Sequence, residues 1–186
     1  MLNERLLLAS RSPRRQEILT AVGWGFEAIA ADIDETRFAF EDAVNYVKRL
    51  ARTKAETLSA RFPDRLVVGA DTVVVIDGEI LGQPRDDDDA RRMLRLLSGK
   101  WHEVLTGVAL MKAEACVVEH ETTRVRFSEM SAAEIDWYVG GGEPRGKAGA
   151  YGIQGSAALF IKEIEGDYFN VVGLPVRLVF ELSRRI

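Results

Sequence analysis

The chain has 186 residues, which is long enough to bury a hydrophobic core in one compact domain or in two small lobes. Hydrophobic residues make up 47% and charged residues 29%, as in ordinary globular proteins, so the composition argues against collagen, coiled-coil and disordered classes. The 25 Lys and Arg against 29 Asp and Glu give a net charge of −4. This charge argues against sequence-independent nucleic-acid binding, which depends on many phosphate contacts from cations.

The single cysteine and the hydropathy pattern predict a cytoplasmic protein. Cys116 has no second cysteine with which to form an internal disulfide, which suggests a reducing compartment. No apolar stretch is long enough to span a membrane, so we expect no membrane partner. The short apolar run 1–10 contains Glu4 and Arg5 and lacks a cationic start, so it is predicted to be a first strand and not a signal peptide.

The first half of the chain is predicted to alternate strands and helices. Ser12 is a favourable N-cap, Pro13 suits the first position of a helix, and Gly23 can end that helix. Asp77 and Gly78 form a strong hairpin signal. The predicted elements are a strand over 6–9, a helix from 13 to 23, a strand over 26–30, a helix over 43–58, and strand runs over 66–70, 73–76 and 80–81.

The second half mixes long strands with short helices. Four aspartates, 86–89, precede an apolar-faced helix that ends at Ser98 and Gly99, and Ser131 with Glu134 forms a capping box. Strands are predicted over 104–111, 116–127 and 158–164, and helices from 131 to 138 and from 175 to 182. The irregular alternation with antiparallel hairpins favours an α/β fold with a mixed sheet over a strictly doubly wound one.

A basic segment lies at the first strand-to-helix turn, Ser10 to Arg15. A helix N-terminus has unpaired N–H groups and a positive dipole end, which disfavour cations and attract anions. Arg14 and Arg15 in the first helical turn therefore indicate a negative partner, and phosphate suits the arginine fork. The alternative is a solvated basic turn that pairs with surface carboxylates.

An aspartate interrupts the apolar run 66–76. Asp71 is costly there unless it is paired, hydrated or bound to metal, and it can serve as a general base for water or as a Mg²⁺ ligand. The alternative is a structural Asp that accepts hydrogen bonds from backbone N–H groups. Glu35, in an acidic loop, is either a second carboxylate for the same metal or a solvated loop acid.

The stretch 140–155 is rich in glycine, which lets a backbone approach a ligand closely. It lacks the pattern of a P-loop, and alone it would indicate a flexible surface loop. Short motifs also occur in order along nearly the whole chain. They are Leu8-Ala9-Ser10-x-Ser12-Pro13-Arg14-Arg15, Ile33-Asp34-Glu35, Leu50-Ala51-Arg52-x-Lys54, Gly69-Ala70-Asp71-Thr72-Val73-Val74, Leu97-Ser98-Gly99, Gly142-Glu143-Pro144 through Lys147-Ala148-Gly149-Ala150-Tyr151-Gly152-Ile153-Gln154-Gly155, and Val172-Gly173-Leu174-Pro175.

These motifs resemble those of the Maf family, nucleoside triphosphate pyrophosphatases once described as septum-formation inhibitors. The resemblance implies one Maf-like domain over 1–186, with a mixed twisted sheet, flanking helices and the elongated two-lobed Maf/ITPase-like fold around a central cleft. It also implies house-cleaning hydrolysis of dTTP, UTP and modified pyrimidine triphosphates to the monophosphate and pyrophosphate. The implied cofactor is a divalent cation, Mg²⁺ or Mn²⁺, and a homodimer is plausible.

The resemblance also implies residue roles. Asp71 corresponds to the proton acceptor that activates water, and Glu35 to an acid on the metal side, so that Glu35 and Asp71 are the expected metal ligands. Three residues match the family's phosphate ligands: Ser10, Arg15 and Lys54. Three others match the positions that mark the dTTP/UTP subfamily, as opposed to the sister subfamily that prefers m7GTP: Arg14, Thr72 and Gln154.

Two positions depart from the family pattern. Gln83 stands where the family usually has Lys, and Gly146 stands where Asp is common. Both departures bear on the catalytic efficiency that we expect more than on the type of reaction. Two other function classes stay open: a cell-division regulator or nucleic-acid-binding protein without hydrolase activity, and a nucleotidyltransferase that releases pyrophosphate and needs an acceptor.

Overall fold

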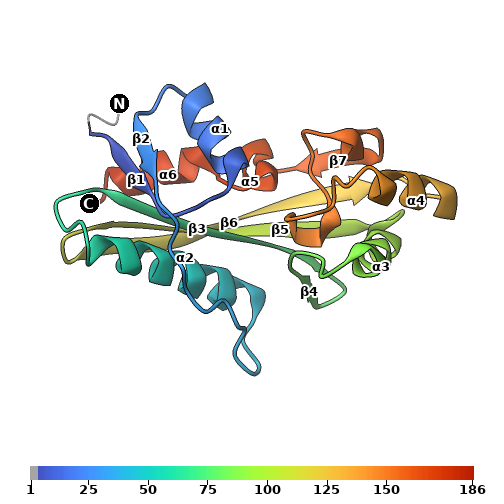
Figure 1. Ribbon diagram of the computed structural model, residues 1–186, viewed down its shortest axis with the longest axis horizontal. Coiled ribbons are helices and arrows are strands. Elements are labelled where there is room, and N and C mark those ends of the chain that lie inside the picture. Colours follow the sequence, from blue (N-terminus) through green and yellow to red (C-terminus); the bar gives the residue numbers. More distant parts are fainter. Residues whose placement is uncertain (1–3) are drawn as a thin grey trace. The chain divides into compact units, whose positions relative to one another are not determined.

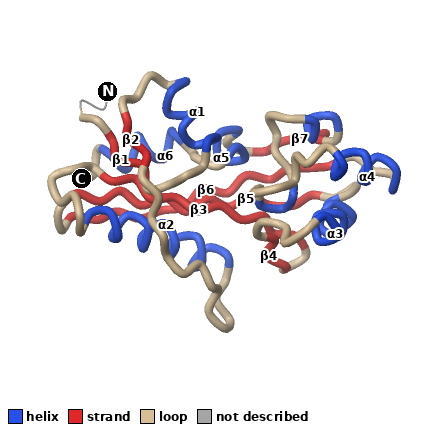
Figure 2. Tube along the Cα trace, in the orientation of Figure 1, coloured by secondary structure: helices blue, strands red, loops and turns tan. Residues whose placement is uncertain are grey.

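The computed structural model describes residues 4–186, and its secondary structure follows most of the predicted order (Figures 1 and 2). Residues 1–3 of the predicted first strand lie outside the described part. The elements are β1 (Leu6–Leu8), α1 (Pro13–Ala21), β2 (Phe26–Ala28), α2 (Ala43–Ser59), β3 (Val67–Ile76), β4 (Glu79–Leu81), α3 (Asp87–Leu97), β5 (Trp101–Lys112), β6 (Ala115–Phe127), α4 (Ala132–Gly140), the 3₁₀ helices η1 (Ala148–Ala150) and η2 (Ser156–Leu159), β7 (Ile161–Glu165), α5 (Tyr168–Val172) and α6 (Val176–Ser183).

The strands form one mixed sheet, which confirms the predicted α/β class. The strand order is β2-β1-β3-β5-β6-β7, and β4 pairs with β3. β1 is parallel to both of its neighbours, with Leu7 opposite Glu27 on one side and Val67 on the other, whereas β4 and β7 pair antiparallel. All three residues of β1 are fully buried, as expected for a parallel strand flanked on both edges.

The contacts divide the chain into two compact units. The first comprises the chain up to Asp71 together with 106–121 and 173–186, and the second comprises 72–105 and 122–172. Three long strands, β3, β5 and β6, each contribute residues to both units. The chain therefore passes repeatedly from one unit to the other within continuous strands.

In the first unit, α2 lies directly against the strands because small residues let the backbones approach. A Cβ atom built on Gly69 would lie 2.1 Å from the Ala51 carbonyl oxygen, and one on Gly107 would lie 2.2 Å from the Val47 carbonyl oxygen. Ala51 and Ala55 of the helix are fully buried. This close contact fixes the helix that carries Lys54 against the strand that carries Asp71.

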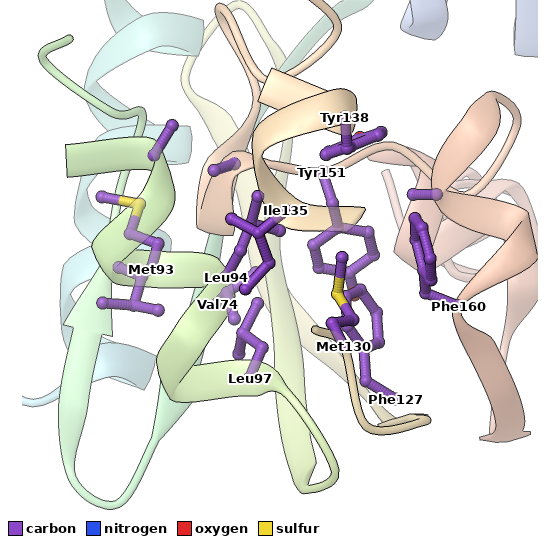
Figure 3. Close-up of a cluster of buried hydrophobic side chains, with 14 of the residues drawn as sticks. Val74, Met93, Leu94, Leu97, Phe127, Met130, Ile135, Tyr138, Tyr151 and Phe160 are labelled. Carbon is purple, nitrogen blue, oxygen red and sulfur yellow. The ribbon is translucent and has the colours of Figure 1, made fainter. Parts of the chain in front are cut away.

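The second unit has its own core, which combines aliphatic side chains with aromatic rings (Figure 3). Two capped helices contribute to it. Asp86 accepts a hydrogen bond from the Asp89 N–H at the start of α3, and Ser131 with Glu134 forms the predicted capping box of α4. The side chains drawn in Figure 3 include Val74, Met93, Leu94, Leu97, Phe127, Met130, Ile135, Tyr138, Tyr151 and Phe160.

Three local predictions need correction. The predicted strand over 158–164 is wrong in its first part, because Ser156–Leu159 form a 3₁₀ helix and the strand begins at Ile161. The helix Tyr168–Val172 was not predicted, since five residues are too few to show a helical period. Ser12 does precede the first helix, but its side chain makes no capping hydrogen bond.

Replacing Gly69 with alanine is expected to lower the free energy of unfolding by about 1–3 kcal/mol or more, because the new methyl group meets rigid helix backbone. Chemical denaturation measures the change. Gly140→Ala is the matched control: its Cβ meets nothing within 4 Å at the end of α4, so stability should be unchanged or slightly higher. Equal stability of the two variants would contradict the close packing of α2.

Candidate active site

The basic turn before α1 is held by hydrogen bonds around Ser10. The Arg15 side chain donates from Nε to the Gly173 carbonyl at 2.8 Å and from Nη1 to the Ser10 Oγ at 3.1 Å. The Ser12 N–H donates to the same oxygen at 3.2 Å. Arg15 is buried and Arg14 half-buried, so the alternative of a solvated basic turn is wrong for Arg15. A buried guanidinium beside a helix N-terminus is suited to a bound anion.

A buried lysine joins the two predicted carboxylates. Lys54, on α2, is only 7% exposed. Its Nζ atom lies 2.6 Å from Asp71 Oδ1 and 2.7 Å from Glu35 Oε1. The structure brings Lys54, Asp71 and Glu35 together in the first unit. The Glu35 side chain is 53% exposed but pairs with Lys54, and Asp71 is paired with the same cation.

Opposing influences act on the Asp71 carboxyl. Burial raises its pKa because the charged form loses hydration, while the charges of Lys54 and Arg15 lower it. The net effect is a pKa above the ordinary aspartate value, to which the negative charge of Glu35 adds. Asp71 is thus a stronger base than an exposed aspartate, and this is the property that proton abstraction from water requires.

The loop that carries Glu35 is fastened to α2. The Tyr46 hydroxyl donates to the Glu35 carbonyl oxygen at 2.8 Å. Arg49 donates to the Thr36 carbonyl at 3.0 Å and forms a bidentate pair with Glu41 at 2.7 and 2.8 Å. Sequence reasoning missed Tyr46 and Arg49, because helical periodicity says nothing about which loop a half-buried side chain meets. These contacts place the Glu35 carboxylate within reach of Lys54.

The remaining predicted positions belong to the second unit. Thr72 is half-buried on β3, Gln154 is exposed between η1 and η2, and Gln83 is exposed in the turn after β4. The glycine-rich stretch is not a simple surface loop, because Gly149, Ala150 and Tyr151 are buried. Its Gly149 N–H donates to the Gly82 carbonyl at 3.0 Å, which joins the stretch to the turn that carries Gln83.

Comparison with known proteins identifies the family. The family model described as Maf-like protein matches residues 5–186. The chain belongs to this family. Among its relatives, dTTP/UTP pyrophosphatases from Symbiobacterium thermophilum and Koribacter versatilis are each 50% identical, over 96% and 97% of this chain and 92% and 93% of those proteins. One from Hahella chejuensis is 53% identical over 92% of this chain and 87% of that protein.

Solved structures agree on the fold of this Maf-like protein. The Ham1 protein of Staphylococcus aureus has a TM-score of 0.56 at 12% identity, with 97% of this chain and 98% of that chain covered. A HAM1 protein from Coxiella burnetii has a TM-score of 0.53 at 15% identity. At these identities the likeness concerns the fold alone, and it confirms the predicted class. Within residues 4–186, no helix is both long and apolar enough to cross a membrane.

Glu35 and Asp71 of this Maf-like protein suit a divalent cation that takes its other ligands from phosphate oxygens and water. Residues 4–186 contain no group of three or more His, Cys, Asp or Glu side chains that could hold a metal ion. Glu35 and Asp71 nevertheless converge on one point, the Lys54 ammonium group. Mg²⁺ commonly binds through one or two carboxylates with phosphate oxygens and water, so two acids are a sufficient protein contribution.

Replacing Lys54 with methionine is expected to raise the pKa of Asp71 further, because the nearest opposite charge is removed. NMR titration of the Asp71 carboxyl carbon measures the change. Lys48→Met is the control, since Lys48 is on the same helix but pairs with Glu119 at 3.4 Å. A pKa of Asp71 that is unchanged or lower in Lys54→Met would show that Lys54 does not govern this carboxyl.

Proposed function

We propose that this protein hydrolyses dTTP and UTP to the nucleoside monophosphate and pyrophosphate. The names of its relatives, at 50 to 53% identity over nearly the full chain, support this substrate class. The observation that matters most is the placement of Lys54 between Asp71 and Glu35, since it puts a base and a cation at one point. Catalysis of phosphoryl transfer consists mainly of positioning and charge stabilisation, and a base beside a cation can position and activate the attacking water.

Asp71 is the proton acceptor in this proposal. Its carboxylate takes a proton from water, the water oxygen attacks the α-phosphorus, and the bond from that phosphorus to the α–β bridging oxygen breaks. Pyrophosphate leaves with the electron pair of that bond, and Asp71 holds the proton until solvent takes it. The raised pKa of Asp71 favours proton uptake, and its pairing with Lys54 keeps the carboxyl oriented.

The cations balance the charge of the triphosphate. Arg15 and Lys54 are buried, so their attraction for phosphate oxygens is weakly screened by water. Ser10 holds the Arg15 fork through its Oγ atom and offers a hydroxyl donor of its own. We assign phosphate binding to Ser10, Arg15 and Lys54. None of these three residues acts as the base in this scheme.

Glu35 and Asp71 would hold the divalent cation, Mg²⁺ or Mn²⁺. When bound, the cation neutralises charge on the phosphate oxygens and on the leaving pyrophosphate. Lys54 contacts one oxygen of each carboxylate. A carboxylate has two oxygens, so both acids could hold a cation while the ammonium group stays beside them and faces the same phosphate oxygens.

Base selection is assigned to Arg14, Thr72 and Gln154. Uracil and thymine present an N3–H donor beside an O4 acceptor, which a glutamine amide can match with its carbonyl and its NH₂ group. We place the enzyme in the cytoplasm, where pyrimidine nucleoside triphosphates are found. A homodimer stays a prediction.

Asp71→Asn is expected to keep the fold and to lower kcat by about 10²–10⁴-fold, because an amide cannot accept the proton. In the wild type, kcat/KM should decline as the pH falls through the raised pKa of Asp71, because the protonated carboxyl is no longer a base. Pyrophosphate release measured from pH 4 to 9 tests both statements. Asp77→Asn, the same chemical change at the hairpin turn after β3, should leave the profile unchanged. Wild-type turnover in Asp71→Asn would leave only a structural role for Asp71.

The activity on dTTP and UTP should exceed that on CTP, ATP and GTP by about tenfold or more in kcat/KM, because a mismatched base leaves polar groups unpaired. A hydrolysis panel with Mg²⁺ and no acceptor compares the five nucleotides. Turnover without an acceptor excludes a nucleotidyltransferase, and the absence of any turnover would favour the regulatory alternative. Equal rates on all five nucleotides would contradict the substrate assignment.

A further inference from the structure

The Gln154 amide by itself cannot tell uracil from cytosine. Cytosine presents the reverse order of donor and acceptor, and a glutamine amide that turns over presents the reverse order as well. Backbone N–H and C=O groups cannot exchange roles in this way. Selection therefore needs the backbone around Gln154 to be held in one place, and the structure shows what holds it.

Glu143 ties the start of the glycine-rich stretch to the residues that follow Gln154. Its Oε2 atom accepts from the Ser156 N–H at 2.7 Å, and its Oε1 atom accepts from the Tyr138 hydroxyl at 2.9 Å. The Ala157 N–H also points to Oε1, at 3.5 Å. Burial acts to raise the pKa of Glu143, but these donors outweigh it and the net shift is downward, so the carboxylate stays charged.

The glycines on either side of Gln154 make room for this arrangement. A Cβ atom on Gly155 would lie 2.3 Å from Glu143 Oε1, and one on Gly152 would lie 2.7 Å from Lys147 Cε. The Gly155 N–H donates to the Gly152 carbonyl at 3.1 Å, which closes the turn that carries Gln154. A side chain at either glycine would push the Glu143 or Lys147 side chain away.

The far end of this connection, at Tyr138, is buried. Tyr138 lies on α4, is 2% exposed, and packs in the second core with its ring centroid 6.2 Å from that of Phe160 (Figure 3). Ile153, immediately before Gln154, is also buried. The backbone is thus held on one side of Gln154 by a buried side chain and on the other by the Glu143 carboxylate.

We propose that Glu143 is a positioning residue for base selection: it fixes the turn Gly152–Ser156 so that its backbone groups and Gln154 present one donor–acceptor pattern to uracil or thymine. This inference rests on the proposed function and deepens it. Glu143 does not contact the reacting phosphate in this scheme. If Glu143 has this role, its loss should change which base is accepted. If its role were purely structural, its loss would lower the activity on all nucleotides equally.

The test compares three variants for selectivity between dTTP and CTP. In Glu143→Gln one acceptor oxygen is lost, so the side chain can no longer accept from both the Ser156 N–H and the Tyr138 hydroxyl. We expect the ratio of the two kcat/KM values to fall by about tenfold, mainly through loss on dTTP. Tyr138→Phe removes one hydrogen bond to Glu143, and we expect a fall of about fivefold. If Glu143→Gln fails to fold, Tyr138→Phe decides the question, since it keeps the ring in the core.

Glu134→Gln is the matched control. Glu134 is another carboxylate of the second unit that accepts several hydrogen bonds, from the Ser131 N–H and Oγ, and its loss weakens a helix cap. Its dTTP/CTP ratio should equal that of the wild type even if stability falls. An unchanged ratio in Glu143→Gln and Tyr138→Phe, or an equal loss on all nucleotides, would overturn the proposal.

A binding measurement separates this inference from the proposed reaction. Calorimetric titration with dTMP and dCMP reports base preference without any turnover. If the wild type prefers dTMP and Glu143→Gln loses that preference, the positioning role holds whether or not dTTP is hydrolysed. If the wild type hydrolyses dTTP and both proteins show the same dTMP preference, the proposed function stands and the role of Glu143 is refuted.

Discussion

The candidate site depends on one buried cation, the Lys54 ammonium group. Burial alone would push the nearby Asp71 toward its neutral form, and Glu35 pushes in the same direction. Lys54, with help from Arg15, opposes both and leaves a carboxyl with a raised pKa that still pairs with a cation. Removing Lys54 would leave the buried Asp71 without its nearest opposite charge, which is costly for a buried group. The contact that offsets the burial of Asp71 therefore also makes the site sensitive to substitution.

The position of Lys54 follows from the close packing of α2. Its neighbours on the helix, Ala51 and Ala55, are fully buried, and Gly69 removes the side chain that would keep β3 away. The lysine stem can then run through the apolar contact while the ammonium group reaches Asp71, two residues beyond Gly69 on the strand. Backbone proximity and electrostatics are thus linked in the first unit. A larger residue at any of these three small positions would move the cation as well as the helix.

Much of the fold could be predicted because it rests on local signals. Three of these signals each lie within a few neighbouring residues, and the structure confirms all three. They are the Asp77-Gly78 turn, the Ser131–Glu134 capping box and the buried run of β1. The misassigned strand start near Ala158 has another cause. There the Ser156 N–H, the first of the 3₁₀ helix, donates to the Glu143 carboxylate, 13 residues earlier in the chain. A pattern of neighbouring residues cannot predict a contact between residues so far apart in the sequence. For the same reason, motif order suggested that Lys54 and Asp71 act together but could not show the 2.6 Å contact.

The two units use different physical means to hold their predicted residues. In the first unit, ion pairs hold Lys54 against Asp71 and Glu35, while Arg15 donates to the neutral Ser10 Oγ and Gly173 carbonyl. In the second, a carboxylate that binds backbone N–H groups holds the turn that carries the exposed Gln154. Ion pairs adjust when a charged ligand arrives, because each partner can exchange one opposite charge for another. A hydrogen-bonded turn does not adjust in this way, since its donors and acceptors have fixed roles. Adjustable contacts suit the binding of a triphosphate whose charge changes during hydrolysis, and a fixed turn suits the reading of a base whose pattern stays constant.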